Sequence, residues 1–122
     1  MAYAALPAAP YAVVLVFGKA QPAAPDLVAQ LGSYNGRFFR ANGLQVLAQP
    51  LDSAQTLVVV RPLPNAAVAK SYASKLRGPL SPLARLRGTG YQTLVISAAN
   101  LVLLQAAKDV AGYQAFFQKS YK

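Results

Sequence analysis

The run YAVVLVF, from Tyr11 to Phe17, is the clearest strand pattern in the chain, because it is apolar throughout and rich in β-branched residues. A run of this length is typical of a central strand that is covered on at least one face. Gly18 follows and ends the pattern. We therefore expect the domain to be built outward from this strand.

Helix and strand patterns alternate after this first strand. Apolar residues recur at helical spacing between Leu27 and Phe38, and a second amphipathic helix is predicted after the capping residue Asn65. The short turn at Asp52-Ser53 favours a hairpin between the strands on its two sides. The predicted elements, in order, are a strand over 11–17, a helix over 27–38, strands over 44–51 and 56–60, a helix over 66–77 and a strand over 91–96.

The order β, α, β, β, α, β predicts the α+β class. We expect a ferredoxin-like plait, with a four-stranded antiparallel sheet and two helices on one of its faces. Ser97 and Asp109 are each placed to cap one further helix, over 98–106 and 110–121, which together form a C-terminal helical extension. Residues 11–122 are expected to be a single domain, and the Ala/Pro-rich residues 1–10 a flexible tail or linker.

The second face of such a sheet also needs a cover, because its strands are apolar. The C-terminal helices are one candidate, since Val110, Tyr113 and Phe117 form an apolar stripe that we expect to pack against the plait. The alternative is that the face binds a partner protein or forms a homo-oligomer with a second copy of the chain.

Membrane-spanning segments are not expected, because no apolar run approaches the roughly 18 residues that a spanning helix requires. Met1 to Pro10 also lacks the basic start, apolar centre and cleavage site of a signal peptide. Any export signal is therefore expected to lie outside this chain.

Side chains for catalysis are scarce. The chain has no histidine, no cysteine and three acidic residues in all, which are Asp26, Asp52 and Asp109. Each aspartate is explained by a helix start, a turn or a helix cap. We therefore expect no enzymatic activity, no catalytic residue, no metal site and no cofactor.

Twelve Lys and Arg residues give the chain a net charge of +9, which favours anionic partners and also favours solubility. Single-stranded RNA binding by a plait would require exposed aromatic residues on the sheet. The strands offer apolar residues such as Val58, Val60, Leu94 and Ile96 instead, and five aromatic residues lie on probable helices, where core packing is expected: Phe38, Phe39, Tyr72, Phe116 and Phe117. The candidate binding surface is a group of basic residues on the second predicted helix and in the loop that follows it: Lys70, Lys75, Arg77, Arg85 and Arg87.

The C-terminal sequence, from Tyr91 to Tyr121, resembles the end of bacterial tetratricopeptide-repeat lipoproteins of the SprE/PorW type. The resemblance consists of a strand that runs into a "VIS..N" segment, followed by "KDV..Y..FF...Y", and it extends upstream to "YN..FF" in the first predicted helix. It implies a location in the periplasm or cell envelope, and a role in gliding motility and type IX protein secretion. The matching residues are Tyr34, Asn35, Phe38, Phe39, Val95, Ile96, Ser97, Asn100, Lys108, Asp109, Val110, Tyr113, Phe116, Phe117 and Tyr121.

The stretch from Val58 to Ile96 is similar to the second half of SPOR domains, through "RPLPNAAVAKSYASKLRG" and the strand that follows Gly90-Tyr91. This resemblance implies binding of peptidoglycan glycan strands. The leading hypothesis is a non-catalytic protein-interaction or scaffold module of the bacterial cell envelope. Glycan binding is the first alternative, and nucleic-acid binding is the second.

Overall fold

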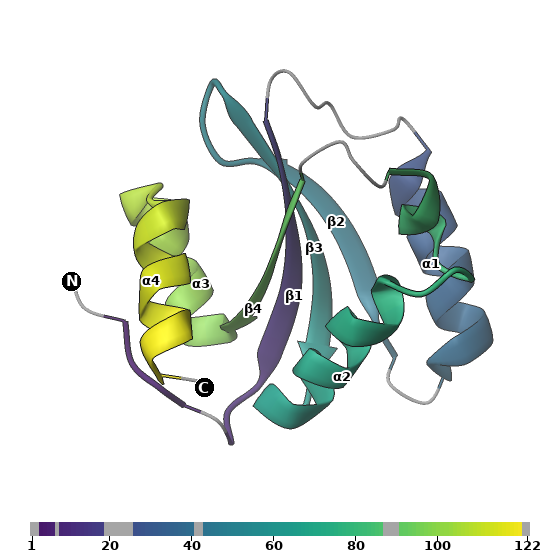
Figure 1. Cartoon of the computed structure of the whole chain (residues 1–122), viewed down its shortest axis with the longest axis horizontal. Helices are drawn as coiled ribbons and strands as arrows, with labels where there is room; N and C mark the ends of the chain where they lie inside the picture. The colour runs from purple at the N-terminus through teal and green to yellow at the C-terminus, as the bar shows by residue number, and fades with distance from the viewer. Residues whose placement is uncertain (1–2, 7, 19–25, 41–42, 87–90, 121–122) are drawn as a thin grey trace.

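The computed structural model of the chain describes residues 3–6, 8–18, 26–40, 43–86 and 91–120 (Figure 1). Four strands form one antiparallel sheet in the order β2-β3-β1-β4. They are β1 (Tyr11–Gly18), β2 (Gln45–Pro50), β3 (Gln55–Leu63) and β4 (Gln92–Ser97). The helices are α1 (Leu27–Phe38), α2 (Ala66–Leu76), α3 (Ala98–Ala107) and α4 (Val110–Ser120), and η2 (Pro82–Leu86) is a short 3₁₀ helix. The predicted ferredoxin-like α+β fold with C-terminal helices is confirmed.

Helices cover both faces of the sheet. Alternate residues of β1 face opposite sides: Tyr11 and Val13 belong to a core with α1 and α2, whereas Ala12 and Val14 belong to a core with α3 and α4. Figure 1 shows these two helix pairs on opposite sides of the strands. The C-terminal helices therefore cover the second face at β1, β3 and β4, as the first of the two alternatives expected. A partner or a second copy of the chain at the sheet stays a prediction.

Side-chain caps start three of the helices. Asn65 accepts a hydrogen bond from the backbone N–H of Val68 at 2.9 Å, and Ser97 accepts one from Asn100 at 3.1 Å. Asp109 accepts one from the N–H of Gly112 at 2.9 Å. These bonds satisfy amide groups that have no partner within a helix, so the predicted cap positions are confirmed.

Strand β3 continues past Pro62, although the sequence predicts a stop there. Tyr11 pairs with Leu63 and Val13 with Val60, so β3 carries one extra residue at this point of the ladder. Such a bulge accommodates a proline, which has no N–H to donate to a neighbouring strand. The predicted end of the strand was wrong for this reason.

The described part of the N-terminal segment lies against the C-terminal helices. The side-chain amide of Asn100 accepts a hydrogen bond from the backbone N–H of Ala4 at 3.1 Å and donates one to its carbonyl oxygen at 2.8 Å. The ring of Tyr3 packs edge-on against Tyr113, with 5.1 Å between the ring centroids. The division of the chain at residue 10 into tail and domain stays a prediction.

Candidate functional site

The basic residues predicted as a binding surface lie on two sides of α2. Lys70, Lys75 and Arg77 are exposed, as expected. Lys70 and Arg77 line a cavity of about 290 Å³ between α2, β4 and α4. Lys75 lines a different cavity, on the side of α2 that faces α1.

The two remaining basic candidates follow α2. Arg85 lies in η2, but its side chain is outside the described residues, as is the whole of Arg87. The structure therefore brings Lys70 and Arg77 together and places Lys75 on another side of α2. That the five residues form a binding surface stays a prediction.

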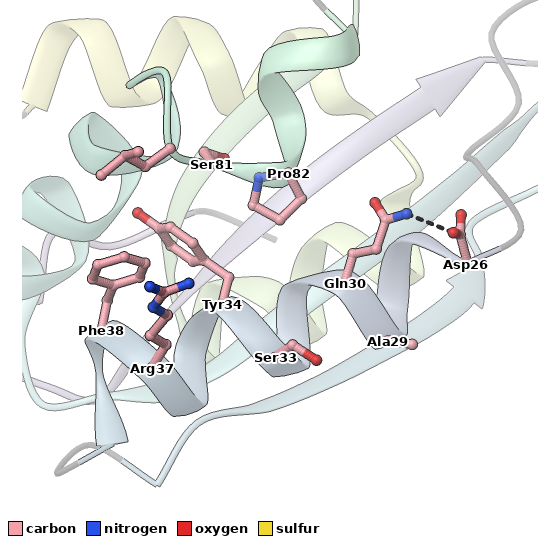
Figure 2. Close-up of a pocket in the computed structure, with 10 residues that line it drawn as sticks. Asp26, Ala29, Gln30, Ser33, Tyr34, Arg37, Phe38, Ser81 and Pro82 are labelled. Atoms are coloured by element: carbon pink, nitrogen blue, oxygen red, sulfur yellow. Dashed lines mark hydrogen bonds between the residues drawn. The ribbon is translucent and has the colours of Figure 1, made fainter.

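A larger groove runs between α1 and the segment that connects α2 to η2. It has two adjoining lobes, an outer lobe of about 470 Å³ and an inner lobe of about 380 Å³. Tyr34, Phe38 and Leu80 line both lobes. We call this site the aromatic groove. In Figure 2, Tyr34, Arg37 and Phe38 rise from α1 toward the segment that carries Ser81 and Pro82.

Contacts between aromatic rings connect the groove to the core. The ring of Tyr34 lies 5.0 Å from Phe38 and 5.9 Å from Phe39, measured between centroids. Phe39 in turn packs edge-on against Tyr72 at 4.8 Å. Tyr72 is buried, and its hydroxyl donates a hydrogen bond to Asn35 Oδ1 at 2.6 Å. The base of the groove is therefore attached to the rigid interior.

The rim of the groove exposes large apolar side chains. Phe38 is 47% exposed and Leu80 is 75% exposed. The expectation that Phe38 packs in the core was wrong, because the buried stripe of α1 runs through Leu27, Leu31 and Asn35, and Phe38 falls at the end of the helix. Of the other predicted core aromatics, Tyr72 is buried, whereas Phe39, Phe116 and Phe117 are half-buried.

Two cations lie over rings of the groove. The guanidinium carbon of Arg37 is 5.5 Å from the centroid of Phe38, and the ammonium nitrogen of Lys75 is 5.3 Å from that of Phe39. Within the described residues, neither cation has a carboxylate partner. Asp26 lies at the far end of the outer lobe, where its carboxylate accepts a hydrogen bond from the amide of Gln30. The groove therefore combines an apolar, aromatic base with positive charge at one end.

Sequence reasoning missed Arg37 and Leu80. Leu80 could have been found, because it lies in the run Gly78-Pro79-Leu80-Ser81-Pro82, where neither a helix nor a strand pattern is available to bury a large apolar side chain. Arg37 had no such signal, since a basic residue in the last turn of a helix is already explained by the helix dipole.

The buried Tyr72 hydroxyl also makes stability depend on pH. Burial raises the pKa of Tyr72, and to a lesser extent that of Tyr34, above the usual value of 10.0. Below pH 10 both the folded and the unfolded protein keep the Tyr72 proton, but above it only the folded protein does. We therefore expect the free energy of unfolding to fall as the pH rises above 10, by up to about 1.4 kcal/mol per pH unit for this residue. Urea denaturation between pH 8 and 11 would measure this, and the slope should be shallower in Tyr72→Phe.

No protein-family model, curated protein or solved structure matches the chain. In the part of the chain that the structure describes, no helix is long and apolar enough to cross a membrane. The same residues contain no group of three or more His, Cys, Asp or Glu side chains that could hold a metal ion.

Proposed function

We propose that this chain is a non-catalytic protein-interaction or scaffold module of the bacterial cell envelope. The observation that carries the proposal is the aromatic groove, in which Phe38 and Leu80 stay exposed above a base that is part of the packed core. Exposed apolar side chains on a rigid scaffold are typical of surfaces that bind other proteins. The envelope location, with a role in type IX secretion and gliding motility, rests on the resemblance of the C-terminal sequence.

The arrangement of the layers also bears on the two alternative functions, which are peptidoglycan binding and nucleic-acid binding. A plait that binds RNA uses exposed aromatic residues on an open sheet face. In this chain the two faces of the central strand pack against α1 and α2 on one side and against α3 and α4 on the other. Peptidoglycan binding keeps only the support of the SPOR resemblance, and both alternatives are outcomes of the experiment below.

Replacing Leu80 by Ser is expected to reduce binding of the partner protein about tenfold, because a central apolar contact of an interface contributes on the order of 1–2 kcal/mol. The matched control is Val102→Ser, since Val102 is 64% exposed but lies on α3, across the sheet from the groove. Each immobilised protein would be tested with an envelope protein extract, with purified peptidoglycan by sedimentation, and with a polynucleotide over a range of salt concentrations.

The expected result is a protein retained by the wild type and by Val102→Ser but reduced on Leu80→Ser. Thermal melting would verify that both variants are folded, which is expected because both side chains are exposed. Glycan or polynucleotide binding that Leu80→Ser does not change, with no protein retained in the first arm, would contradict the proposal.

A further inference from the structure

The aromatic groove offers two kinds of contact at the same place, and together they define a class of ligand. Phe38 and Leu80 line both lobes, so a ligand that fills both can place an apolar group against these side chains in each lobe. Each lobe is large enough for a bulky side chain, since pockets of about 300–1,000 Å³ hold whole small ligands. The groove therefore favours a ligand with two apolar anchors a short distance apart.

The charges at the groove add a second requirement. Arg37 lines the outer lobe and Lys75 the inner lobe, so each apolar anchor would have a cation beside it. Within the described residues neither cation is paired with a carboxylate, and the only acidic residue that lines either lobe, Asp26, is at the end remote from Lys75. The net charge of +9 also attracts negatively charged partners to this surface.

The cations lie over aromatic rings of the groove. Arg37 lies over Phe38 and Lys75 over Phe39, so both side chains already have a packed position on an aromatic ring. A carboxylate can bind a cation that remains on its ring, and the entropy lost by ordering the side chain on binding is then smaller.

We infer that the aromatic groove binds a short acidic peptide segment of a partner protein, which inserts two apolar side chains into the two lobes and places Asp or Glu carboxylates beside Arg37 and Lys75. This inference rests on the proposed function and names the chemistry of its partner. A polyanion such as nucleic acid would leave the apolar base of the groove without a matching contact, so the peptide is the ligand that uses both features.

The inference can be tested by selecting binders from a displayed library of random twelve-residue peptides against the full chain. The selected peptides are expected to be enriched in Asp and Glu together with Leu, Ile, Phe or Tyr, and depleted in Lys and Arg.

Affinities of the selected peptides would then separate the two kinds of contact. The Arg37→Gln/Lys75→Gln variant is expected to weaken binding about fivefold at low salt and less at high salt, because ions screen exposed charges. Leu80→Ser should weaken binding at both salt concentrations. Lys119→Gln, which removes an exposed charge from α4, is the matched control and should change nothing.

The inference is overturned if no peptide is enriched, if the enriched peptides are not acidic, or if an oligonucleotide depends on Arg37 and Lys75 while the peptides do not. Its failure can be distinguished from failure of the proposed function. If Leu80→Ser still loses a protein from the envelope extract, the interaction module stands and only the chemistry of its partner is wrong. If Leu80→Ser retains every captured protein, both proposals are wrong.

Discussion

A chain that ends at Ala107 is expected to unfold at a much lower temperature than the full chain, with a loss of at least about 3 kcal/mol in the free energy of unfolding. The truncation removes α4, whose residues Val110 and Tyr113 are buried in the second core. It also removes the hydrogen bond that the Tyr113 hydroxyl donates to the carbonyl oxygen of Val95 on β4. Thermal and urea denaturation would measure the loss.

The matched control is a chain that ends at Phe117. It lacks only the last residues, of which 118–120 are exposed, and keeps every α4 side chain that belongs to the second core. We expect its free energy of unfolding to stay within about 0.5 kcal/mol of the full chain. An unchanged melting temperature in the chain that ends at Ala107 would show that α4 is an appendage, and the account of the covered second face would then be wrong.

Local patterns were sufficient to predict most of the fold. The apolar run Tyr11–Phe17 became the central strand β1, and the order of strands and helices predicted the sheet topology. Asn65, Ser97 and Asp109 were predicted as caps because a helix start needs a nearby side-chain acceptor, a requirement that is visible in the sequence. Such features depend on residues within a few positions of one another.

Features that depend on distant residues were not predicted. The continuation of β3 past Pro62 depends on its register with β1, and the exposure of Phe38 depends on where α1 ends relative to the sheet. The contact between Asn100 and Ala4 joins residues 96 positions apart. Pattern reasoning along the chain has no access to such pairs.

Two residues of the "VIS..N" segment have structural roles. Ser97 caps α3, and Asn100 binds both the N–H and the carbonyl oxygen of Ala4. The aromatic part of the "YN..FF" segment is different, because Tyr34, Phe38 and Phe39 line the aromatic groove. Of the residues that carry the resemblance, Tyr34, Phe38 and Phe39 are therefore the ones most directly connected with the proposed binding function.

Tyr72→Phe is expected to lower the free energy of unfolding by about 2 kcal/mol, because it leaves a buried polar group without its hydrogen bond. Asn35 is 3% exposed, and its Oδ1 accepts the Tyr72 hydroxyl proton at 2.6 Å. Its Nδ2 atom is buried without a partner among the described residues. Removing the hydroxyl would leave the whole Asn35 amide unpaired beneath the aromatic groove. Urea denaturation at pH 7 would measure the loss.

The second half of this prediction is that Asn35→Leu restores most of the stability when it is combined with Tyr72→Phe. The double variant removes both polar groups at once, and an apolar pair of similar shape leaves nothing buried and unpaired. We therefore expect the double variant to be at least about 1 kcal/mol more stable than the sum of the two single effects predicts.

Tyr34→Phe is the control, since the Tyr34 hydroxyl is only part-buried and contacts the Lys75 carbonyl oxygen at a long 3.5 Å. It should change stability by less than about 0.5 kcal/mol. Strictly additive effects of Tyr72→Phe and Asn35→Leu would show that the two side chains do not stabilise the fold as a pair.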